Sequence, residues 1–387
     1  MPSNPQDERF MREALDLARQ GIALASPNPC VGAVIVDGSG AVVGRGFHTY
    51  DGLKHAEVLA MEEAGPKANG ATLYLNLEPC SHQGRTGPCA DAVIAAGIKR
   101  VVTAIQDPNP AVSGNGFAKL RTAGIEVNVG LLEEEARYLN EGFAKFVRTK
   151  LPLITLKSGM TLDGKIAPPP GESETPTALG AAVTTSGWIT SEEARAHVQV
   201  LRHQVDAILV GVGTVIADDP LLTDRTSLPR RRRLLRVVLD SRLRLPLESR
   251  LVVTAREDVL VFCSFAEEKR KAELEKRGVQ VVQVPMAREA GHPDFAEVMR
   301  HLGEQQITSV LVEGGANVNW VALASGLVDK IFLYYAPKIL GGTGSISFAG
   351  GRGFRNITDA AQVRRVRLHR FGEDFAVEGY LKDPYTE

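Results

Sequence analysis

The chain has 387 residues, which exceeds the roughly 100–200 residues of a usual domain and predicts two or three domains. Hydrophobic residues make up 44% of the chain and charged residues 24%, values that exclude a disordered, collagen-like or coiled-coil protein. The 45 basic side chains nearly balance the 46 acidic ones, so no global positive field would attract a nucleic acid or an anionic membrane. We therefore expect a small-molecule partner, with neither nucleic acid nor membrane bound.

Two further features concern location and the use of cysteine. The longest apolar stretches fall short of the roughly 18 residues that a membrane span needs, and residues 1–9 lack the pattern of a signal peptide. We expect a cytoplasmic protein. Its 4 cysteines are too few for a disulfide scaffold, which leaves free thiols, metal ligands or nucleophiles.

Residues 1–150 carry patterns of strands and helices in alternation. Apolar spacing predicts a helix over residues 7–20, and the apolar run at 31–36 predicts a buried strand that leads into a hairpin. Helices are then expected at 55–64, 89–96 and 133–148, and strands at 72–77 and 100–105. This order predicts an α/β layered domain with a central sheet, and Pro152 marks the boundary that we expect near residue 150.

The same alternation restarts in residues 151–387. Thr190 and Glu193 form a capping box that predicts the start of a helix. Strands are expected at 153–156, 207–210, 235–239, 259–263, 279–284 and 309–313. Residues 167–180 show neither period, and their proline-rich start is typical of an exposed loop. The sequence therefore predicts a second α/β domain.

Three residues with metal-ligand chemistry lie in the first half. His55 opens a predicted helix, Cys80 follows a predicted strand, and Cys89 comes later in the chain. Zinc prefers nitrogen and sulfur ligands, and three protein ligands leave a fourth position for water, as in catalytic sites. Glu57 is close to a ligand in sequence and suits a general acid/base that carries protons to a leaving amino group. His-x-Glu followed by Pro-Cys and a second Cys is the signature of zinc-dependent nucleobase deaminases.

Other interpretations of this cluster stay open. A His-x-Glu pair by itself is usually an ordinary solvated pair, and a structural zinc site would need a fourth Cys or His ligand. Cys263 stands on an apolar strand of the second half, where we expect it in the core. A binding protein with structural zinc predicts no role for Glu57. A deaminase that edits nucleic acid predicts a basic face and aromatic platforms, but aromatic residues make up only 6% of the chain.

The first half resembles a known family in several motifs. These are Ser26-Pro27-Asn28-Pro29 before the apolar run at 31–36, His55-Ala56-Glu57, and Glu78-Pro79-Cys80-Ser81-His82 leading to Cys89. Eight residues separate the two cysteines, where the commoner deaminase pattern has two. With this spacing the segment resembles the deaminase half of the RibD family of bifunctional bacterial riboflavin-biosynthesis enzymes.

This resemblance implies a cytidine-deaminase-like three-layer α/β fold and hydrolytic deamination of 2,5-diamino-6-ribosylamino-4(3H)-pyrimidinone 5′-phosphate. It implies that His55, Cys80 and Cys89 hold zinc, Zn²⁺, and that Glu57 is the catalytic proton carrier. It also puts three residues at substrate-contacting positions, namely Asn28, His48 and Arg85. Arg85 belongs to the polar insert between the cysteines and could reach a phosphate or a polar base edge.

Two glycine-containing junctions follow predicted strands in the second half. Gly211 and Gly213 do not complete a Rossmann fingerprint, because Ile216 stands where the third glycine belongs. Gly314 and Gly315 precede a predicted helix whose free backbone N–H groups could receive a phosphate. Each junction alone is as consistent with a tight turn, but the two together suggest a dinucleotide site.

Ordered motifs in this half resemble the reductase half of the same family. They are Leu162-Asp163-Gly164-Lys165, Ser186-Gly187-Trp188-Ile189-Thr190, Asp218-Asp219-Pro220, Asp240-Ser241 and Glu313-Gly314-Gly315. The resemblance implies a dihydrofolate-reductase-like α/β fold and NADPH-dependent reduction of a ribosyl group to ribityl. The implied cofactor contacts are Gly159, Trp188, Thr214, Asp218, Ser241, Gly315, Ala316, Asn317, Val318 and Asn319. The implied substrate contacts are Lys157, Ser186, Arg202, Asp218, Leu222, Arg225 and Glu313.

Several points stay open at this stage. Lys157 and Asp218 are both candidates for the polar group at the reacting carbon, and the sequence does not decide between them. Residues 168–185 form a segment longer than the family usually has, either a lid over the cofactor or a disordered excursion. The four arginines at 230–233 are expected to form a solvated loop.

The leading hypothesis is one chain with two active sites. Residues 1–150 would form a zinc deaminase and residues 151–387 an NADPH reductase, and both would act on small nucleotide-like substrates. We also expect a homo-oligomer.

Overall fold

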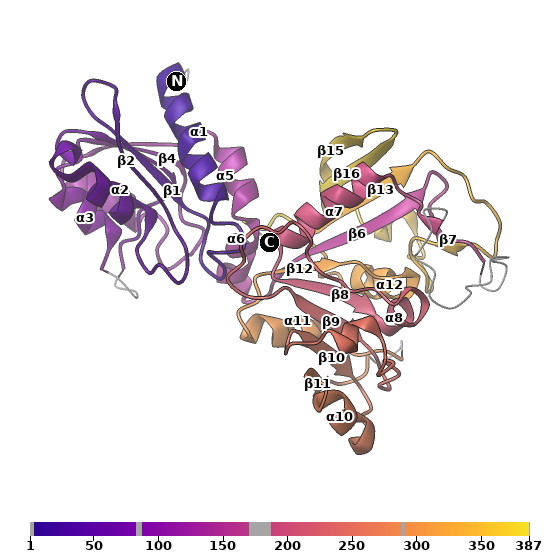
Figure 1. Ribbon diagram of the computed structural model, residues 1–387. Coiled ribbons are helices and arrows are strands. Elements are labelled where there is room, and N and C mark those ends of the chain that lie inside the picture. Colours follow the sequence, from indigo (N-terminus) through magenta and orange to yellow (C-terminus); the bar gives the residue numbers. More distant parts are fainter. Residues whose placement is uncertain (1–3, 83–86, 170–186, 288–290, 387) are drawn as a thin grey trace. The chain divides into compact units, whose positions relative to one another are not determined.

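The computed structural model describes residues 4–82, 87–169, 187–287 and 291–386 (Figure 1). The chain divides into two compact units. Unit 1 comprises residues 1–150 together with 229–232, and unit 2 comprises residues 151–228 and 233–387. Within the described ranges, no helix is both long and apolar enough to cross a membrane.

Unit 1 is built on a five-stranded sheet with the strand order β2-β1-β3-β4-β5. β1 pairs antiparallel with β2 and β3, whereas β3, β4 and β5 are parallel. The strands are β1 (Gly32–Val36), β2 (Val42–Phe47), β3 (Thr72–Leu77), β4 (Arg100–Ile105) and β5 (Glu126–Val129). The helices are α1 (Pro5–Arg19), α2 (Ala56–Ala64), α3 (Cys89–Ala95), α4 (Asn115–Thr122), α5 (Glu133–Leu139) and α6 (Glu141–Thr149), with a short 3₁₀ turn at Gly65–Ala68.

Two glycines establish the layers of unit 1. A Cβ atom on Gly32 would lie 2.1 Å from the carbonyl oxygen of Ala14 in α1, and one on Gly46 would lie 2.3 Å from the carbonyl oxygen of Ala56 in α2. Gly46 pairs with Ala33, the neighbour of Gly32 in β1, so the two glycines face opposite sides of the sheet. The sheet therefore lies between α1 and α2, and Figure 1 shows α5 beside α1 and α3 beside α2. The expected three-layer α/β fold is confirmed.

The end of unit 1 differs from the sequence-based prediction. The single helix predicted over residues 133–148 is two helices, α5 and α6, because the chain turns at Asn140. The Asn140 side chain accepts a hydrogen bond from the backbone N–H of Cys30 at 2.8 Å and donates one to the Cys30 carbonyl at 3.1 Å. These contacts with a segment far away in the sequence stabilise the turn between α5 and α6. The helical periodicity of the sequence does not indicate such contacts.

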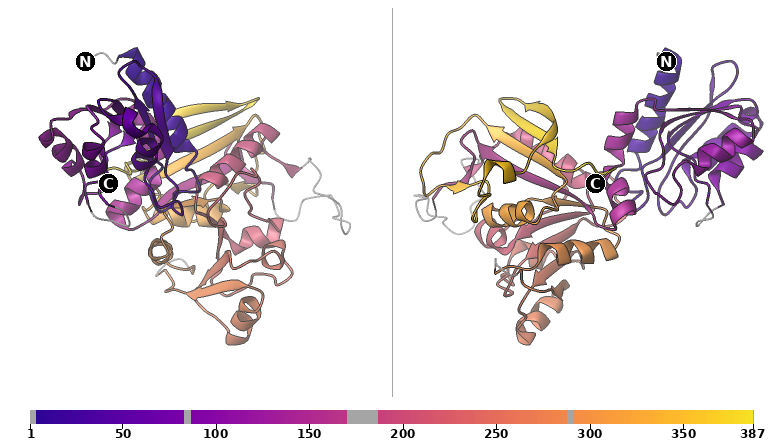
Figure 2. Two further views of the ribbon diagram at one scale, coloured as in Figure 1. Left: turned by 60° about the vertical axis from the view of Figure 1, so that its left-hand side comes forward. Right: turned by 180° about the vertical axis from the view of Figure 1, so that it is seen from behind.

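Unit 2 contains a nine-stranded sheet with the order β11-β10-β9-β8-β12-β6-β13-β16-β15. The first seven strands of that order are parallel, and β16 and β15 add an antiparallel edge, drawn in yellow in Figures 1 and 2. The strands are β6 (Leu153–Thr161), β8 (Ala207–Gly211), β9 (Leu235–Leu239), β10 (Val259–Cys263), β11 (Val279–Gln283), β12 (Ser309–Val312), β13 (Lys330–Ala336), β15 (Arg364–Phe371) and β16 (Asp374–Tyr380). β7 (Lys165–Ala167) and β14 (Ile346–Ser347) form a separate small ribbon.

Helices cover both faces of the parallel part of this sheet. Leu209 of β8 packs with α11 and α12, whereas its neighbours Ile208 and Val210 pack with α9 and α10. Both faces of each central strand are buried, which explains why these strands have continuous apolar sequences. The helices are α7 (Glu192–Gln204), α8 (Val212–Asp218), α9 (Arg250–Val253), α10 (Glu268–Glu275), α11 (Phe295–Glu304) and α12 (Ala316–Ala324), with a 3₁₀ turn at Ile357–Asp359.

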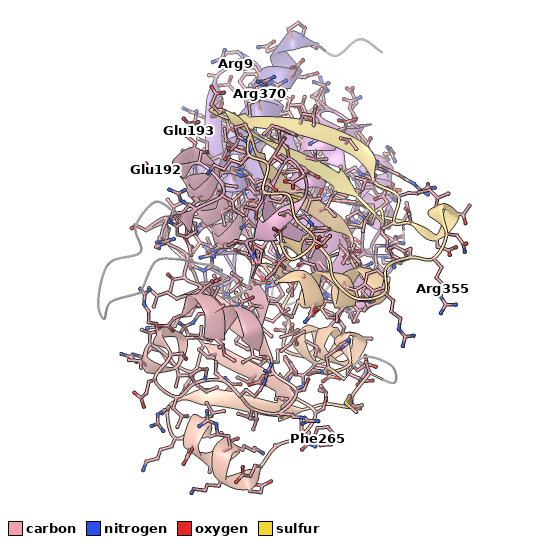
Figure 3. The ribbon with its side chains drawn as sticks, turned by 90° about the vertical axis from the view of Figure 1, so that its right-hand side faces the viewer. Arg9, Glu192, Glu193, Phe265, Arg355 and Arg370 are labelled. Atoms are coloured by element: carbon pink, nitrogen blue, oxygen red, sulfur yellow. The ribbon has the colours of Figure 1, made fainter. Side chains whose placement is uncertain are left out.

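The start of α7 corrects the predicted capping box of Thr190 and Glu193. The N-cap residue is Ser191, whose hydroxyl accepts a hydrogen bond from the backbone N–H of Ala194 at 3.2 Å. Glu192 and Glu193 lie in the exposed first turn of the helix (Figure 3). Their negative carboxylates interact favourably with the positive N-terminal end of the helix dipole, but neither residue forms the capping box.

Residues 229–232 belong to unit 1 although they interrupt the sequence of unit 2. The backbone N–H of Arg231 donates to the Ala23 carbonyl at 3.0 Å, and its guanidinium lies 4.2 Å from the centre of the Tyr50 ring. The expectation that the arginine run is a solvated loop is therefore wrong for Arg231.

Candidate active sites

The ends of three elements of unit 1 form the first site. His55 is the N-cap of α2, Cys80 follows β3, and Cys89 is the first residue of α3. The Nδ1 atom of His55 lies 3.1 Å from the Cys89 sulfur and 3.6 Å from the Cys80 sulfur. The ligand atoms of the three residues all lie within 4.8 Å of one another. One nitrogen and two sulfur donors at this separation fit a zinc ion with an open fourth position.

Backbone hydrogen bonds fix the two cysteines to each other. The N–H of Cys89 donates to the Cys80 sulfur at 3.3 Å, and the N–H of Ala90 donates to the Cys80 carbonyl at 3.0 Å. The hydrogen bond between the two thiol groups, together with His55, lowers the pKa of Cys80 to about 4. The same hydrogen bond and burial raise the pKa of Cys89. Two thiolates in this space therefore require a cation to neutralise them, as a bound metal does.

Glu57 lies beside this cluster in the first turn of α2. Its residue is only 3% exposed, and its Oε2 atom has no hydrogen-bond partner in the described part of the chain. Burial raises the pKa of this carboxyl, with opposition from the positive charge of His55. A buried carboxyl with a free oxygen and a raised pKa is suited to hold a proton and release it.

Two of the predicted substrate contacts adjoin the cluster. The Nδ1 atom of His48 lies 2.9 Å from the Lys54 carbonyl, which can only accept, so Nδ1 carries the proton. In the neutral ring the other nitrogen, Nε2, then accepts from the side-chain amide of Asn28 at 3.0 Å. The His48 and His55 rings meet edge to face with centres 5.2 Å apart. Arg85, the third predicted contact, lies outside the described residues.

Glu78 was quoted in the sequence motif but not given a role. Its carboxylate accepts hydrogen bonds from four backbone N–H groups at 2.8–3.2 Å, those of Asp107, Gly114, Gly116 and Phe117. It thereby ties the segment before Cys80 to the start of α4. The available signal was a carboxylate placed directly after an apolar strand and before Pro-Cys.

The second site is a cavity of about 1290 Å³ in unit 2. It opens at the carboxyl ends of parallel strands, where ligands of open α/β sheets bind. Ten predicted site residues line it: Lys157, Gly159, Thr214, Asp218, Ser241, Glu313, Gly315, Ala316, Asn317 and Val318. Ser186 lies outside the described residues.

Glu313 organises the polar end of this cavity. Its carboxylate accepts two hydrogen bonds from Arg202, at 2.7 and 3.0 Å, and one from the Lys157 ammonium at 3.3 Å. Burial favours the neutral acid, but Lys157 and Arg202 outweigh it and lower the pKa of Glu313 to about 2. Burial alone raises the pKa of Asp218. The site therefore holds a fixed carboxylate between two cations, and a second carboxyl more readily protonated than usual.

The glycine junctions bring backbone close to the space that a dinucleotide would occupy. A Cβ atom on Gly211 would lie 2.7 Å from a methyl group of Val318, and one on Gly314 would lie 2.5 Å from its Cβ. Glycine is thus required for the close packing of α12 against β8. The first-turn N–H groups of α12 have no acceptor within the helix, and Asn319 beside them has a buried Oδ1 without a hydrogen-bond partner in the described chain. This arrangement fits a cofactor with a pyrophosphate group.

The other predicted residues of unit 2 that the structure describes are not part of the cavity lining. Trp188 is exposed, with the Arg195 guanidinium 4.9 Å from the centre of its ring. Leu222 and Asn319 are buried, Arg225 is exposed, and Arg202 reaches the site through Glu313. Their contacts with ligands stay predictions.

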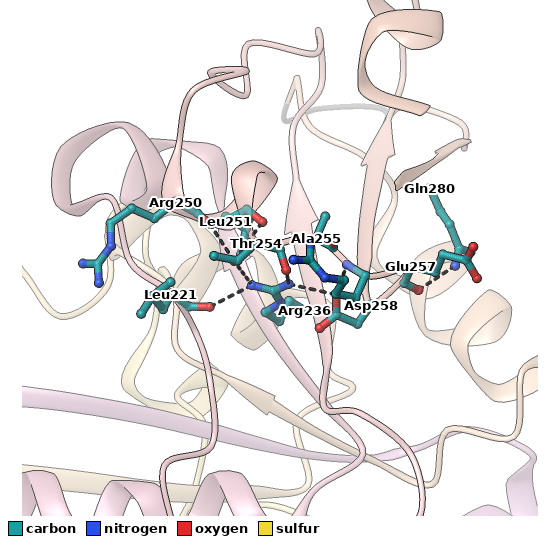
Figure 4. Close-up of polar contacts among 10 residues, drawn as sticks. Leu221, Arg236, Arg250, Leu251, Thr254, Ala255, Glu257, Asp258 and Gln280 are labelled. Carbon is teal, nitrogen blue, oxygen red and sulfur yellow. Dashed lines mark hydrogen bonds and ion pairs between the residues drawn. The ribbon is translucent and has the colours of Figure 1, made fainter. Parts of the chain in front are cut away.

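Arg236 is a buried positioning residue that the sequence analysis missed. Its guanidinium donates to the Leu221 carbonyl at 3.2 Å, to the hydroxyl and carbonyl of Thr254, and to the Asp258 carboxylate at 2.8 Å (Figure 4). It thereby holds the chain between Asp218 and Leu222. The available signal was an arginine inside an otherwise apolar strand.

The folds and the two sites define a two-domain enzyme, a zinc-binding deaminase joined to a reductase. Residues 4–105 match the cytidine and deoxycytidylate deaminase zinc-binding region, and residues 152–377 match the RibD C-terminal domain. The chain belongs to the RibD family, and it is a bifunctional riboflavin biosynthesis enzyme. The cofactors of the family, zinc and NADPH, agree with the donor cluster of unit 1 and the cavity of unit 2.

Relatives and solved structures cover nearly the whole chain. The chain is 43% identical over 372 residues to riboflavin biosynthesis protein RibD of Aquifex aeolicus, covering 96% of this chain and 97% of that protein. It is 42% identical over 380 residues to RibD of Escherichia coli, covering 95% and 98%. A structure of Acinetobacter baumannii RibD superposes with a TM-score of 0.81 at 36% identity, covering 97% of this chain and 98% of that one.

A second solved structure carries a more specific description. It is a diaminohydroxyphosphoribosylaminopyrimidine deaminase/5-amino-6-(5-phosphoribosylamino)uracil reductase from Thermotoga maritima. It superposes with a TM-score of 0.79 at 37% identity, covering 97% of this chain and 98% of that one.

Proposed function

We propose that unit 1 deaminates 2,5-diamino-6-ribosylamino-4(3H)-pyrimidinone 5′-phosphate by hydrolysis, and that unit 2 reduces the ribosyl group of the product to ribityl with NADPH. The observation that carries the proposal is the buried carboxyl of Glu57 beside three zinc donors, with an Oε2 atom that has no hydrogen-bond partner in the described part of the chain. The description of the Thermotoga maritima structure supports the two substrates.

In the deamination, water replaces the exocyclic amino group of the ring and ammonia leaves. His55, Cys80 and Cys89 would hold the zinc ion, which would supply a nucleophilic water at neutral pH. Glu57 takes a proton from that water and gives it to the departing amino group. Asn28 and His48, joined by their hydrogen bond, orient the ring of the substrate, and Arg85 contacts its polar edge or phosphate.

In the reduction, the cavity of unit 2 would hold NADPH, which would supply the hydride for the ribosyl carbon. Glu313 holds Lys157 and Arg202 in place, and the arginines Arg202 and Arg225 suit the 5′-phosphate of the substrate. Ser186 and Leu222 complete the substrate contacts. Trp188, Thr214, Asn319 and the start of α12 contact the cofactor.

Lys157 and Asp218 both line the cavity and can hold a proton there. The variants K157M and D218N distinguish them. A group that supplies the proton gives one limb of the pH profile of kcat. Replacing that residue should remove this limb, and replacing the other residue should leave both limbs in place.

The proposal is tested by a paired assay with the diaminopyrimidinone ribotide. Ammonia release is followed without NADPH, and NADPH oxidation is followed after it is added. We expect both signals from the wild-type protein. The E57Q variant should keep its zinc, lose ammonia release by at least about a hundredfold, and still oxidise NADPH with the deaminated substrate. Zinc-loaded protein that releases no ammonia, or an E57Q variant that releases it normally, would contradict the assignment.

We also infer a cytoplasmic location and a homo-oligomer. Thiol ligands such as Cys80 and Cys89 persist in a reducing compartment. The edge strand β15 exposes Val366 and Leu368, which are 53% and 72% exposed, and a second copy could cover them. Sedimentation should give a mass above 41.7 kDa for the wild-type protein and a lower mass for L368K. A wild-type protein that sediments as a monomer would refute the oligomer.

A further inference from the structure

Lys157 has a second neighbour besides Glu313 that fixes its charged end. The ammonium donates to the Glu313 carboxylate at 3.3 Å, and it also lies 5.8 Å from the centre of the Tyr334 ring. A cation within about 6 Å of an aromatic ring is attracted by the electron-rich face of that ring, most strongly where water is excluded. Tyr334 is only 1% exposed. The position of the lysine therefore depends on a buried aromatic ring as well as on its ion pair.

The register of two parallel strands brings the ring and the lysine together. In the pairing of β6 with β13, Lys157 lies opposite Phe332, and Gly159 lies opposite Tyr334. Paired residues lie on the same face of a sheet, as do residues two apart in one strand, so Lys157 and Tyr334 share the face that α7 covers. Gly159 has no side chain that could lie between the ring and the ammonium. The attraction between the two groups is thus direct.

His197 of α7 holds the hydroxyl end of Tyr334. Its Nδ1 atom lies 2.7 Å from the tyrosine hydroxyl, and its ring packs against those of Phe332 and Phe371. Burial and, to a lesser extent, the nearby His369 lower the pKa of His197. The imidazole is therefore neutral at pH 7, and a neutral imidazole can accept the hydroxyl proton of Tyr334 at Nδ1.

α7 thereby contacts both neighbours of Lys157. Arg202, in the last turn of the helix, donates two hydrogen bonds to Glu313, at 2.7 and 3.0 Å. His197, five residues earlier, binds Tyr334. Because a phenol that shares its proton with an acceptor is polarised, its ring becomes more electron-rich and attracts a cation more strongly. One helix therefore fixes the carboxylate and the aromatic ring between which the ammonium lies.

We propose that Tyr334 and His197 are positioning residues of the reductase, which hold the Lys157 ammonium in place for the substrate. The inference rests on the proposed function, in which Lys157 contacts the substrate. Neither positioning residue is part of the cavity lining, so both act through the lysine. An ammonium has three N–H donors, of which Glu313 takes one. The face of a ring attracts the charge without a further carboxylate to compete with the substrate.

The test is a double-mutant cycle on substrate binding to the full chain. The dissociation constant of the deaminated substrate is measured without NADPH, so that no turnover occurs, for the wild-type protein, Y334L, K157M and the double variant. We expect Y334L to weaken binding about three- to thirtyfold, and the double variant to bind as K157M does. A ring that merely supports the fold would weaken binding by the same factor in both backgrounds. Such additive losses, or wild-type binding by Y334L, would overturn the proposal.

Y335L is the matched control. Tyr335 follows Tyr334 in β13 and lies on the opposite face of the sheet, where its ring stacks on Phe375. It is absent from the cavity lining. The variant removes a similar aromatic ring from the same strand, and it should bind the substrate as the wild type does.

Two milder variants remove the hydrogen bond and keep the core filled. Y334F retains the ring, and H197L retains a large side chain at its position. Each should weaken substrate binding about two- to fivefold, the two together should weaken it no more than either alone, and the loss should vanish in the K157M background. Wild-type binding by both variants, or additive losses, would refute the role of His197. A wild-type protein that neither binds the deaminated substrate nor oxidises NADPH with it would instead overturn the reductase function on which the inference rests.

Discussion

Glu313 is the residue on which most of the polar contacts of the reductase site depend. Replacing it with Gln leaves Lys157 and Arg202 without their shared counter-charge in a buried place. We expect E313Q to lower kcat/KM of the reduction at least about tenfold while ammonia release stays at the wild-type rate. Reduction at the wild-type rate would show that the carboxylate does not organise the site.

The same residue predicts a pH dependence of stability. The pKa of Glu313 lies near 2 in the folded protein, below its ordinary 4.5, so the folded state favours the carboxylate. Its contribution, about 3 kcal/mol, is complete above the ordinary pKa and is lost as the pH falls toward 2. Free energies of unfolding in urea should therefore differ less between wild type and E313Q at pH 3 than at pH 7. A difference that grows on acidification would contradict this sign.

The metal donors and the residues that support them differ in how far sequence reveals them. His55, Cys80 and Cys89 could be proposed because their residue types and order have few other uses in a chain with 4 cysteines. Glu78 could not be assigned, because its partners are backbone groups far along the chain, and two of the groups that Arg236 binds are backbone carbonyls as well. A side chain that binds backbone leaves no partner residue type to search for.

At the scale of single elements, the start of α7 offers a direct comparison of two capping schemes. Ser191 accepts the backbone N–H of Ala194, while the predicted cap Thr190 lies one residue too early. We expect S191A to lower the free energy of unfolding by about 1 kcal/mol and T190A to lower it by less than half as much. Urea unfolding of both variants measures these losses of unfolding free energy. A larger loss in T190A than in S191A would support the predicted capping box instead.

Most strands of the parallel part of the sheet in unit 2 were predicted, including the edge strand β11, but the buried strand β13 and the exposed strand β15 were not. β9 and β10 are buried on both faces and have unbroken apolar sequences, so their bounds were predicted as the structure has them. β15 is exposed along most of its length and contains several arginines, such as Arg370 in Figure 3, so no apolar run marks it. β5 was missed for a related reason, since it is short and mostly exposed.

At the scale of the whole molecule, two separate cores predict two responses to ligands. Zinc binding stabilises only the folded form of unit 1, and NADPH only that of unit 2. We expect calorimetry to resolve two transitions, of which chelation lowers one and NADPH raises the other. In the H55A variant the first transition should no longer respond to the chelator. A single transition that responds to both ligands would show that the units unfold together.

The bonds between Cys80 and the start of α3 bear on how this type of zinc site changes over evolution. Because the N–H groups of Cys89 and Ala90 both bind Cys80, the separation of the two sulfurs is set at the base of the intervening segment. Lengthening that segment from two residues to eight adds only about 1 kcal/mol of loop-closure entropy. Insertions between the cysteines can therefore alter substrate selection while the metal ligands stay in place.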